Sequence, residues 1–252
     1  MVTAVVTAGG RVNPSFAALA GTNVKALVPV KGRPLIYYCL SALAQAQSVG
    51  KIVVVGPTAA LEGQPGMEKV ERIIEEVGTA PDNILASLRA LRQEERVLVC
   101  TSDVPHMTAE AVDDFMASCP KDADIGYAVV RNEAFEERYP GVHHMRVRLR
   151  EGVFTGGSLM VIQPAALEAN LTLINNTFLA RKSKLGMVRL LGIGFVVKFL
   201  LGTLSIPDIE ERARLFTGCL CRAVISDRPE VAFDIDDPEQ VAIAEQGLEN
   251  QI

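Results

Sequence analysis

The chain has 252 residues, of which 49% are apolar, and its mean hydropathy is +0.23. These values fit one large α/β domain with a substantial core and exclude a disordered chain. Thirty acidic residues against 25 basic ones give a net charge of −5, which offers nucleic acid no general attraction. Five cysteines without a C-x-x-C pair, and no secretory signal at the start, predict a protein of the reducing cytoplasm.

Apolar runs alternate with helical patterns through the first half of the chain. This alternation is typical of parallel strands joined by crossover helices. In such sheets ligands bind beyond the carboxyl ends of the strands, so the residues after each strand are candidate site residues. We expect strands at 3–7, 51–55, 97–101 and 125–130, and helices at 34–47, 67–76, 83–91 and 109–118.

The pattern changes after residue 131. Segment 131–142 is polar and predicts a loop, while the alternation at 145–149 predicts an edge strand. A helical block is expected over about 165–217, inserted into a single domain that spans 1–252. Further strands are expected at 155–162, 221–225 and 231–233, and a last helix from Pro238 to about Glu249.

The most apolar part of the helical block is segment 185–201. Arg189 and Lys198 interrupt it, so it lacks the ~18 consecutive apolar residues of a membrane-spanning helix. The pattern favours a helix in the core or at a homodimer interface. A helix lying on a membrane surface is the alternative, because the nearby cations Arg181, Lys182 and Lys184 could face anionic lipid.

Two glycines follow the first predicted strand, in the run Ala8-Gly9-Gly10-Arg11. Because glycine has no Cβ, such a turn brings backbone N–H groups close to a bound phosphate. Arg11 and Lys25 would supply positive charge beside it. The run does not extend into G-x-G-x-x-G, which disfavours a dinucleotide cofactor.

Asp103 comes directly after the strand predicted at 97–101. A carboxylate at that edge of the sheet suits Mg²⁺, which binds one or two carboxylates together with phosphate oxygens. The alternative is an Asx turn or a helix cap, although Thr108 is a better cap for the helix at 109–118. The neighbouring His106 is either a contact to a substrate or a surface histidine.

A second acidic cluster lies near the end of the chain, at Asp234, Asp236 and Asp237. In an extended segment Asp234 and Asp236 share one face. Asp237 precedes Pro238 and is expected to cap the last helix. The first two carboxylates are therefore free to bind a metal, or in the case of Asp234 to contact solvent.

These segments resemble the nucleotidyltransferase superfamily that includes sugar-1-phosphate nucleotidyltransferases and molybdenum cofactor guanylyltransferases. The loop of that family reads A-G-G, then Arg, then K-x-L-x-x-x-x-G-x-P-L. The matching residues here are Ala8, Gly9, Gly10, Arg11, Lys25, Leu27, Gly32, Pro34 and Leu35. Relatives usually space the basic residue from the glycines, whereas here Arg11 follows Gly10 directly, so Arg11 either takes the relatives' phosphate role or holds the loop. The resemblance implies a Rossmann-like, GT-A type α/β/α sandwich of three layers around a mostly parallel mixed sheet.

The resemblance also implies roles for individual residues. Relatives carry an S-D-x-P segment whose Asp binds metal, matched by Asp103, and an N/D-I-N/D-T-P element whose second acidic position is matched by Asp236. Asn83 or Ser87 would contact the base, although Asp82 as a helix cap accounts for much of the same segment. The pair Gly156-Gly157 would line an acceptor pocket, with a plain tight turn as the alternative.

Together these features predict a Mg²⁺-dependent nucleotidyltransferase. It would transfer a nucleoside monophosphate from a nucleoside triphosphate to a small phosphorylated acceptor and release pyrophosphate, with Lys25, Arg11 and Asp103 as catalytic residues. The alternatives are a glycosyltransferase that uses a nucleotide sugar and a non-catalytic nucleotide-binding or assembly protein. The sequence specifies neither the acceptor nor the base.

Overall fold

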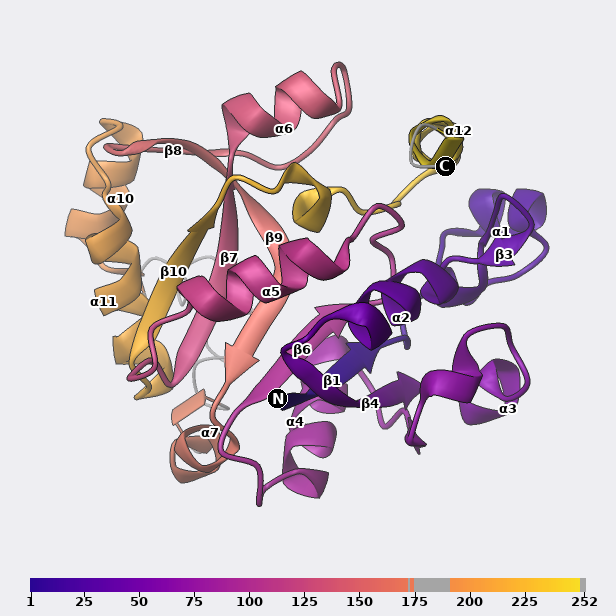
Figure 1. Cartoon of the computed structure of the whole chain (residues 1–252). Helices are drawn as coiled ribbons and strands as arrows, with labels where there is room; N and C mark the ends of the chain where they lie inside the picture. The colour runs from indigo at the N-terminus through magenta and orange to yellow at the C-terminus, as the bar shows by residue number, and fades with distance from the viewer. Residues whose placement is uncertain (172, 175–190, 250–252) are drawn as a thin grey trace.

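An eight-stranded mixed sheet runs through the molecule in the order β10-β7-β9-β6-β1-β4-β5, with β8 paired to β9 (Figure 1). The computed structural model describes residues 1–171, 173–174 and 191–249. A separate hairpin pairs β2 (Pro29–Val30) with β3 (Arg33–Pro34). The strands of the large sheet are β1 (Val2–Thr7), β4 (Val49–Gly56), β5 (Arg72–Glu75), β6 (Val97–Thr101), β7 (Ile125–Arg131), β8 (Val147–Leu149), β9 (Gly152–Ile162) and β10 (Cys221–Ser226).

Strand directions divide the sheet into two parts. Strands β5, β4, β1 and β6 are parallel to one another, and β7 is parallel to β10. Strand β9 lies between β6 and β7 and is antiparallel to both. The mostly parallel mixed sheet expected from the sequence is therefore confirmed.

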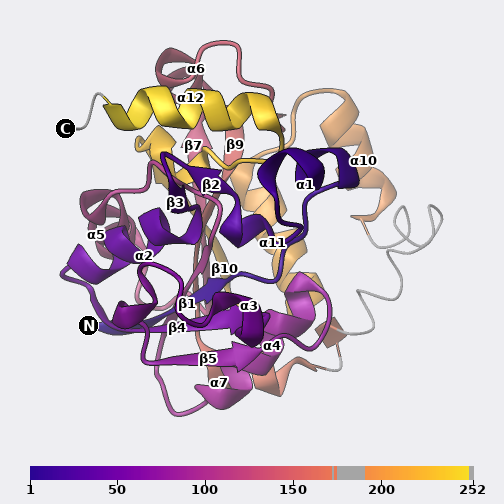
Figure 2. The ribbon, with the colours of Figure 1, turned by 90° about the vertical axis from the view of Figure 1, so that its right-hand side faces the viewer.

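Helices cover both faces of the sheet (Figures 1 and 2). Helices α2 and α5 pack on one face, and α4 and α7 pack on the other, which gives the three layers of a sandwich. The helices are α1 (Pro14–Ala20), α2 (Ile36–Gln45), α3 (Thr58–Leu61), α4 (Ala80–Ala90), α5 (Ala109–Ser118), α6 (Asn132–Arg138), α7 (Pro164–Ala169), α10 (Ile193–Leu200), α11 (Ile206–Thr217) and α12 (Pro238–Glu249), with short 3-10 turns η1 (Lys25–Leu27), η2 (Met67–Lys69) and η3 (Pro229–Ala232).

The central strand β1 is apolar on both faces because both are covered. Ala4 and Val6 point to the core layer beneath α2 and α5, while Val5 points to the layer beneath α4 and α7. All three side chains are fully buried. A parallel strand covered on both sides reads as a continuous apolar run rather than an alternating one.

Three predicted elements were wrong. The helix expected at 67–76 is a 3-10 turn followed by the edge strand β5, whose side chains are polar at both ends because it pairs on one side only. Segment 131–142 contains helix α6, which packs on the sheet through the buried ring of Phe135. The strand expected at 231–233 is the end of η3, where Phe233 turns inward and stacks on Tyr139.

Part of the helical block lies within the described residues. Helix α10 begins after Gly192, whose φ of 78° is left-handed, and α11 begins at a capping box between Ser205 and Asp208. The cations Arg181, Lys182 and Lys184 and the first part of segment 185–201 lie outside the described residues. Across residues 1–171, 173–174 and 191–249, no helix has the length and hydropathy needed to cross a bilayer.

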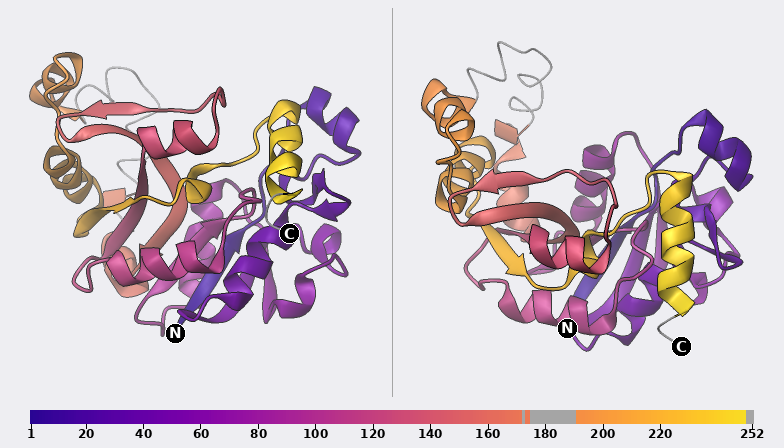
Figure 3. Two further views of the ribbon diagram at one scale, coloured as in Figure 1. Left: turned by 45° about the horizontal axis from the view of Figure 1, so that its top comes forward. Right: turned by 90° about the horizontal axis from the view of Figure 1, so that it is seen from above.

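The last helix, α12, lies beside the early segment of the chain that contains α1 and the β2–β3 hairpin (Figure 3). It packs on the β2–β3 hairpin and on the loop that follows β6. There the ring of His106 is 1% exposed, and its two nitrogens lie 2.9 Å from the Ala244 carbonyl oxygen and 3.0 Å from the Tyr139 hydroxyl. His106 is thus neither a surface histidine nor a substrate contact, because it fastens α12 to the sheet.

Candidate active site

The predicted site segments meet because their strands are neighbours. Strand β1 lies between β4 and β6, and Thr7 is opposite Val55 on one side and Thr101 on the other. The Ala8–Arg11 turn and Asp103 therefore leave adjacent strands at the same edge of the sheet. This is the arrangement that the alternation of strands and helices predicts.

The diglycine turn is held from both sides. The Ala8 N–H donates to the Val55 carbonyl oxygen at 2.7 Å, and the Gly10 carbonyl oxygen accepts from the Lys25 N–H at 3.0 Å. A Cβ on Gly9 would lie 2.8 Å from Asn83 Nδ2, so a larger residue does not fit there. The hydrogen bond between Lys25 and Gly10 therefore holds Lys25 directly beside the two glycines.

Lys25 lies between two carboxylates. Its Nζ forms ion pairs with Asp103 Oδ2 and, at 2.6 Å, with Asp236 Oδ1, and its side chain is 15% exposed. Burial opposes the charge on this ammonium, but the Asp103 carboxylate and hydrogen bonds to both partners outweigh burial and raise the pKa of Lys25 above its ordinary value. Lys25 is therefore a fixed positive charge at neutral pH.

Three carboxylates converge around that ammonium. Asp103, Asp234 and Asp236 each place one oxygen within 4.8 Å of the others. Burial, followed by the charges of Asp103 and Asp236, raises the pKa of Asp234 to about 6, and the Lys25 charge opposes this rise. Segments far apart in the sequence thus build one acidic cluster, as the sequence predicts.

The cluster fits a divalent cation. Three carboxylates and one ammonium leave two negative charges uncompensated, and oxygen donors are the ligands that Mg²⁺ prefers. Asp103 Oδ1 is buried and has no hydrogen-bond partner among the described residues. A buried carboxylate oxygen without a partner is costly, and a metal ion would satisfy it.

Backbone hydrogen bonds set the position of the second acidic segment. The Ile235 N–H donates to the Asp103 carbonyl oxygen at 3.1 Å, and Ile235 itself is fully buried. The Asp236 N–H donates to Gln240 Oε1 at 2.5 Å, while Asp237 Oδ1 accepts from the Glu239 and Gln240 N–H groups and caps α12. The predicted cap is confirmed, and Asp234 and Asp236 share a side although the segment is not a strand.

The Arg11 side chain points back to the diglycine turn. Its guanidinium forms an ion pair with Glu76 and donates to the Gly9 carbonyl oxygen at 2.6 Å. Sequence reasoning missed Glu76 because it placed this residue at the end of a helix. In the structure the Glu76 N–H donates to the Gly56 carbonyl oxygen at 3.2 Å, just beyond β5, and the side chain reaches the diglycine turn.

The two residues expected to contact the base are buried in α4. Asn83 Oδ1 accepts from the Val77 N–H at 2.8 Å, and the Ser87 hydroxyl donates to the Asn83 carbonyl oxygen at 2.7 Å. Thr79 caps this helix, and Asp82 accepts from the Thr79 N–H in a capping box, so Asp82 as the cap was wrong. Asn83 shapes the diglycine turn, and base contact by Asn83 or Ser87 stays a prediction.

Gly156 and Gly157 lie inside β9, opposite an irregularity in β7. A Cβ on Gly157 would stand 2.9 Å from the Ala128 Cβ, and one on Gly156 would stand 2.6 Å from the Tyr127 hydroxyl oxygen. A tight turn was therefore the wrong alternative. Both glycines permit close approach within the sheet, and Gly156 lines a cavity.

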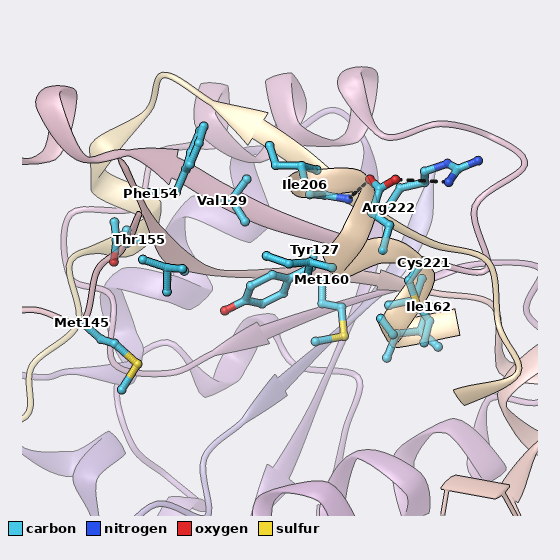
Figure 4. Close-up of a pocket in the computed structure, with 18 of the residues that line it drawn as sticks. Tyr127, Val129, Met145, Phe154, Thr155, Met160, Ile162, Ile206, Cys221 and Arg222 are labelled. Atoms are coloured by element: carbon cyan, nitrogen blue, oxygen red, sulfur yellow. Dashed lines mark hydrogen bonds and ion pairs between the residues drawn. The ribbon is translucent and has the colours of Figure 1, made fainter. Parts of the chain in front are cut away.

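The resemblance implied an acceptor pocket at Gly156 and Gly157, but neither the size nor the apolar lining of this cavity was predicted. It measures about 1090 Å³ and reaches from Asp234 and Asp236 across the sheet to α11. Figure 4 shows side chains of β7, β9 and β10 lining it, and their apolar atoms make up most of its surface. No sequence signal marked the apolar lining, because its residues come from separate segments whose apolar pattern resembles an ordinary core.

Comparisons with known proteins agree with this geometry. The family model for the MobA-like NTP transferase domain matches residues 4–185. The solved structure of a hypothetical transferase from Thermus thermophilus is 35% identical, with a TM-score of 0.83 over 95% of this chain and 99% of that one. No curated protein matches the sequence.

More distant structures share the fold. A 4-diphosphocytidyl-2C-methyl-D-erythritol synthase from Anaerococcus prevotii has a TM-score of 0.61 at 13% identity, over 99% of this chain and 96% of that one. A nucleotidyl transferase from Methanothermobacter has a TM-score of 0.58 at 17% identity, over 100% of this chain and 99% of that one. The chain belongs to the family of MobA-like NTP transferase domains, and it is an enzyme of the nucleotidyltransferase type.

Proposed function

We propose that this enzyme transfers a nucleoside monophosphate from a nucleoside triphosphate to a small phosphorylated acceptor, with Mg²⁺, and releases pyrophosphate. One observation carries the proposal. The Lys25 ammonium and the carboxylates of Asp103, Asp234 and Asp236 meet beside the diglycine turn at the sheet edge. A cation, a metal-binding cluster and a phosphate-binding turn are the parts that polyphosphate chemistry needs.

Asp103, Asp234 and Asp236 would hold the metal. When bound, Mg²⁺ would add positive charge next to the phosphate oxygens and help orient them. The turn at Ala8, Gly9 and Gly10 would present backbone N–H groups to the triphosphate. Its close packing against Lys25 fixes where those groups point.

Lys25 would stabilise the negative charge that develops during transfer. An acceptor phosphate oxygen attacks the α-phosphorus in line, a new P–O bond forms, and the bond from the α-phosphorus to the bridging oxygen breaks. The electron pair leaves with pyrophosphate, next to the fixed ammonium. Since a phosphate monoester dianion is already a nucleophile, this step requires no general base.

Arg11 takes an indirect role in this scheme. Its ion pair with Glu76 and its hydrogen bond to the Gly9 carbonyl oxygen hold the turn in shape. Arg11 is therefore a positioning residue here, rather than the phosphate ligand expected from the sequence. Asn83 supports the same turn, and contact of Asn83 or Ser87 with the base remains part of the proposal.

A thermal-shift screen of the four ribonucleoside triphosphates, with and without Mg²⁺, is the first test. A ligand that binds only the folded state raises the unfolding midpoint. Pyrophosphate release on adding candidate acceptors then separates a nucleotidyltransferase from a glycosyltransferase that uses a nucleotide sugar. Binding without any turnover would favour the non-catalytic alternative.

Location and assembly are further parts of the proposal. Four of the five cysteines are buried free thiols, which supports a reducing cytoplasmic setting. Ile193 and Leu200 of α10, and Leu201 directly after it, are more than two-thirds exposed, and we propose this surface for the homodimer or peripheral membrane contact. Gel filtration tests for the homodimer, and flotation with anionic vesicles tests for the membrane contact.

A further inference from the structure

The cavity beside the acidic cluster offers a ligand little except apolar surface. Its floor is formed by Tyr127 and Val129 of β7 and by Met160 of β9, and its wall includes Ile206 and Ile209 of α11 (Figure 4). These side chains are only partly buried, so part of the sheet face is left open to a ligand. Contact between such surface and water is unfavourable, and an apolar ligand would remove it.

Three charged or titratable side chains among the described residues of the wall, Arg222, Glu210 and His144, already have partners. Arg222 Nη1 donates to Glu210 Oε2 at 3.3 Å, and Glu210 Oε1 accepts from the Ala223 N–H at 2.9 Å (Figure 4). His144 Nε2 lies 2.8 Å from Asn132 Oδ1. A polar ligand would therefore gain few new hydrogen bonds from these three side chains, and the carboxylates of Asp234 and Asp236 lie at one end of the cavity.

The size of the cavity also favours a ligand with a large apolar group. Ligand sites typically measure about 300–1,000 Å³, and this cavity of about 1090 Å³ lies at the upper limit of that range. A small phosphorylated sugar bound at the acidic cluster would leave most of the apolar wall in contact with water. A ligand that fills the cavity must carry a large apolar group.

Helix α10 provides an independent observation. Its Phe195 packs with Leu149 and Phe154, two residues that also line the cavity. On its outer side, Ile193 and Leu200 are each 76% exposed. Exposed apolar side chains on one short helix are typical of a surface that contacts another apolar body, such as the lipid phase or micelle in which an amphiphilic substrate resides.

We propose that the acceptor is an amphiphile, with a phosphate head at the acidic cluster and a hydrocarbon chain in the cavity. The inference rests on the proposed function and names the class of its acceptor. The head would supply the oxygen that attacks the α-phosphorus, and pyrophosphate would leave. Since Asp234 and Asp236 line the same cavity, the head and the chain would occupy one continuous space.

A series of alkyl phosphates tests the proposal without requiring turnover. Butyl, octyl and dodecyl phosphate, each below its micelle concentration, would be titrated calorimetrically into the full chain. Each methylene that enters the cavity should tighten binding by about fourfold, until the cavity is full. Equal affinities across the series would overturn the proposal.

Paired variants on α11 locate the binding. Ala213 lines the cavity, and Ala213→Trp would fill part of it with a large aromatic ring. Leu215 lies on the same helix, is 52% exposed and is absent from the lining, so Leu215→Trp is the matched control. We expect Ala213→Trp to weaken dodecyl phosphate at least tenfold and Leu215→Trp to leave it unchanged, with nucleotide binding kept in both as the measure of folding.

Pyrophosphate release distinguishes a failure of the proposed function from a failure of the proposed acceptor class. With a nucleoside triphosphate present, release that rises with chain length supports both the proposed function and the amphiphilic acceptor. Chain-length-dependent binding with no release from any acceptor supports the cavity assignment and counts against the proposed function. Release with a polar sugar phosphate, together with no gain from dodecyl phosphate, overturns the amphiphile and keeps the function.

A second copy of the chain is the competing occupant. In that case gel filtration would show a dimer of the 27.1 kDa chain, and none of the alkyl phosphates would bind. That result would overturn the proposal. A monomer that binds dodecyl phosphate, or a dimer that still binds it, supports the proposal.

Discussion

The two parts of the sheet differ in how fully they are covered. Strands β5, β4, β1 and β6 lie in the part of the sheet that has helices on both faces, and the four central residues of β1 are buried. Strands β9, β7 and β10 have α5 on one face, but the other face borders the cavity. A fully covered parallel sheet leaves room for a ligand only at its strand ends, whereas a half-covered one also provides a wall.

This difference suggests a division of labour. In the proposed mechanism, Asp103, just beyond β6, and Lys25, in η1, place charge at the nucleotide. The β9-β7-β10 part would supply the apolar surface that contacts the acceptor. Changes in the first part should therefore alter turnover and metal binding, and changes in the second should alter which acceptor binds.

Lys25→Ala should have the largest effect. It removes the one ammonium that lies between Asp103 and Asp236, and loss of a single preorganised electrostatic group lowers kcat by about a hundredfold or more. Pyrophosphate release is the measurement. Lys51→Ala is the control, because Lys51 is exposed and pairs only with Glu71 in the described chain. Near-normal turnover of Lys25→Ala would remove Lys25 from the mechanism.

Asp236→Asn should weaken divalent metal binding by about tenfold or more, because it removes one of three converging carboxylates. Mn²⁺ binding, followed by electron paramagnetic resonance, measures this without turnover. Asp237→Asn is a matched control, since asparagine caps a helix as well as aspartate does. Equal Mn²⁺ affinity in the two variants would mean that the cluster does not hold the metal.

Gly247→Ala tests the packing of α12 against the buried ring of His106. A Cβ on Gly247 would lie 2.5 Å from His106 Nε2, and this ring is buried and held at both nitrogens. We expect a loss of about 1–3 kcal/mol in the free energy of unfolding, the usual cost of overpacking. Gly194→Ala in α10, where a Cβ meets nothing within 4 Å, should be neutral or stabilising. Urea denaturation measures both, and an unchanged Gly247→Ala would contradict the packing at His106.

The stability that this contact between His106 and α12 provides should depend on pH. Burial lowers the pKa of His106 below its ordinary 6.5, so the unfolded chain takes up the proton more readily. This lowered pKa makes His106 destabilising as pH falls through 6.5, by at most about 1.4 kcal/mol per pH unit. The raised pKa of Asp234, about 6, has the opposite sign, since its stabilising effect is full below about 3.9 and is lost as pH rises through 6.

Comparison with His106→Gln isolates the histidine, because the Asp234 contribution is common to both proteins. Between pH 7.5 and pH 5.5 the unfolding free energy of the wild type should fall relative to that of the variant. Urea denaturation at the two pH values gives this difference. Parallel changes in the two proteins would show that His106 takes up its proton equally in the folded and unfolded chains.

Arg11→Ala should have the smallest effect. An exposed ion pair contributes about 0–1 kcal/mol, so loss of the pair with Glu76 should lower kcat/KM by at most about fivefold. Glu76→Ala should give a loss of similar size if both residues act through the turn. A much larger loss for Arg11→Ala alone would restore the phosphate contact that the sequence predicts.

The parallel part of the fold could be predicted because its strands are continuous apolar runs. The diglycine turn and Asp103 were predicted to share a site because each follows such a strand and matches a family motif, and they do meet because β1 and β6 are adjacent in the sheet. Edge strand β5 was mistaken for a helix because its pairing on one side leaves no clear alternation. That error also hid Glu76, which no local pattern connects to the turn.

Contacts between distant segments could not be predicted from local pattern. His106 was judged from its neighbour Asp103, whereas its actual partners, Tyr139 and Ala244, come from α6 and α12. The cavity is likewise a product of how far α11 stands from β7 and β9, and side-chain periodicity carries no information on that distance. The joint position of Asp234 and Asp236 was right, although backbone bonds to Asp103 and Gln240, rather than a strand, produce it.

A crystal structure of the protein with Mn²⁺ and a non-hydrolysable nucleoside triphosphate would test the central claim most directly. The anomalous signal of Mn²⁺ should lie among Asp103, Asp234 and Asp236, with the triphosphate between the diglycine turn and Lys25. A metal bound elsewhere, or a nucleotide seated away from Lys25, would contradict the account.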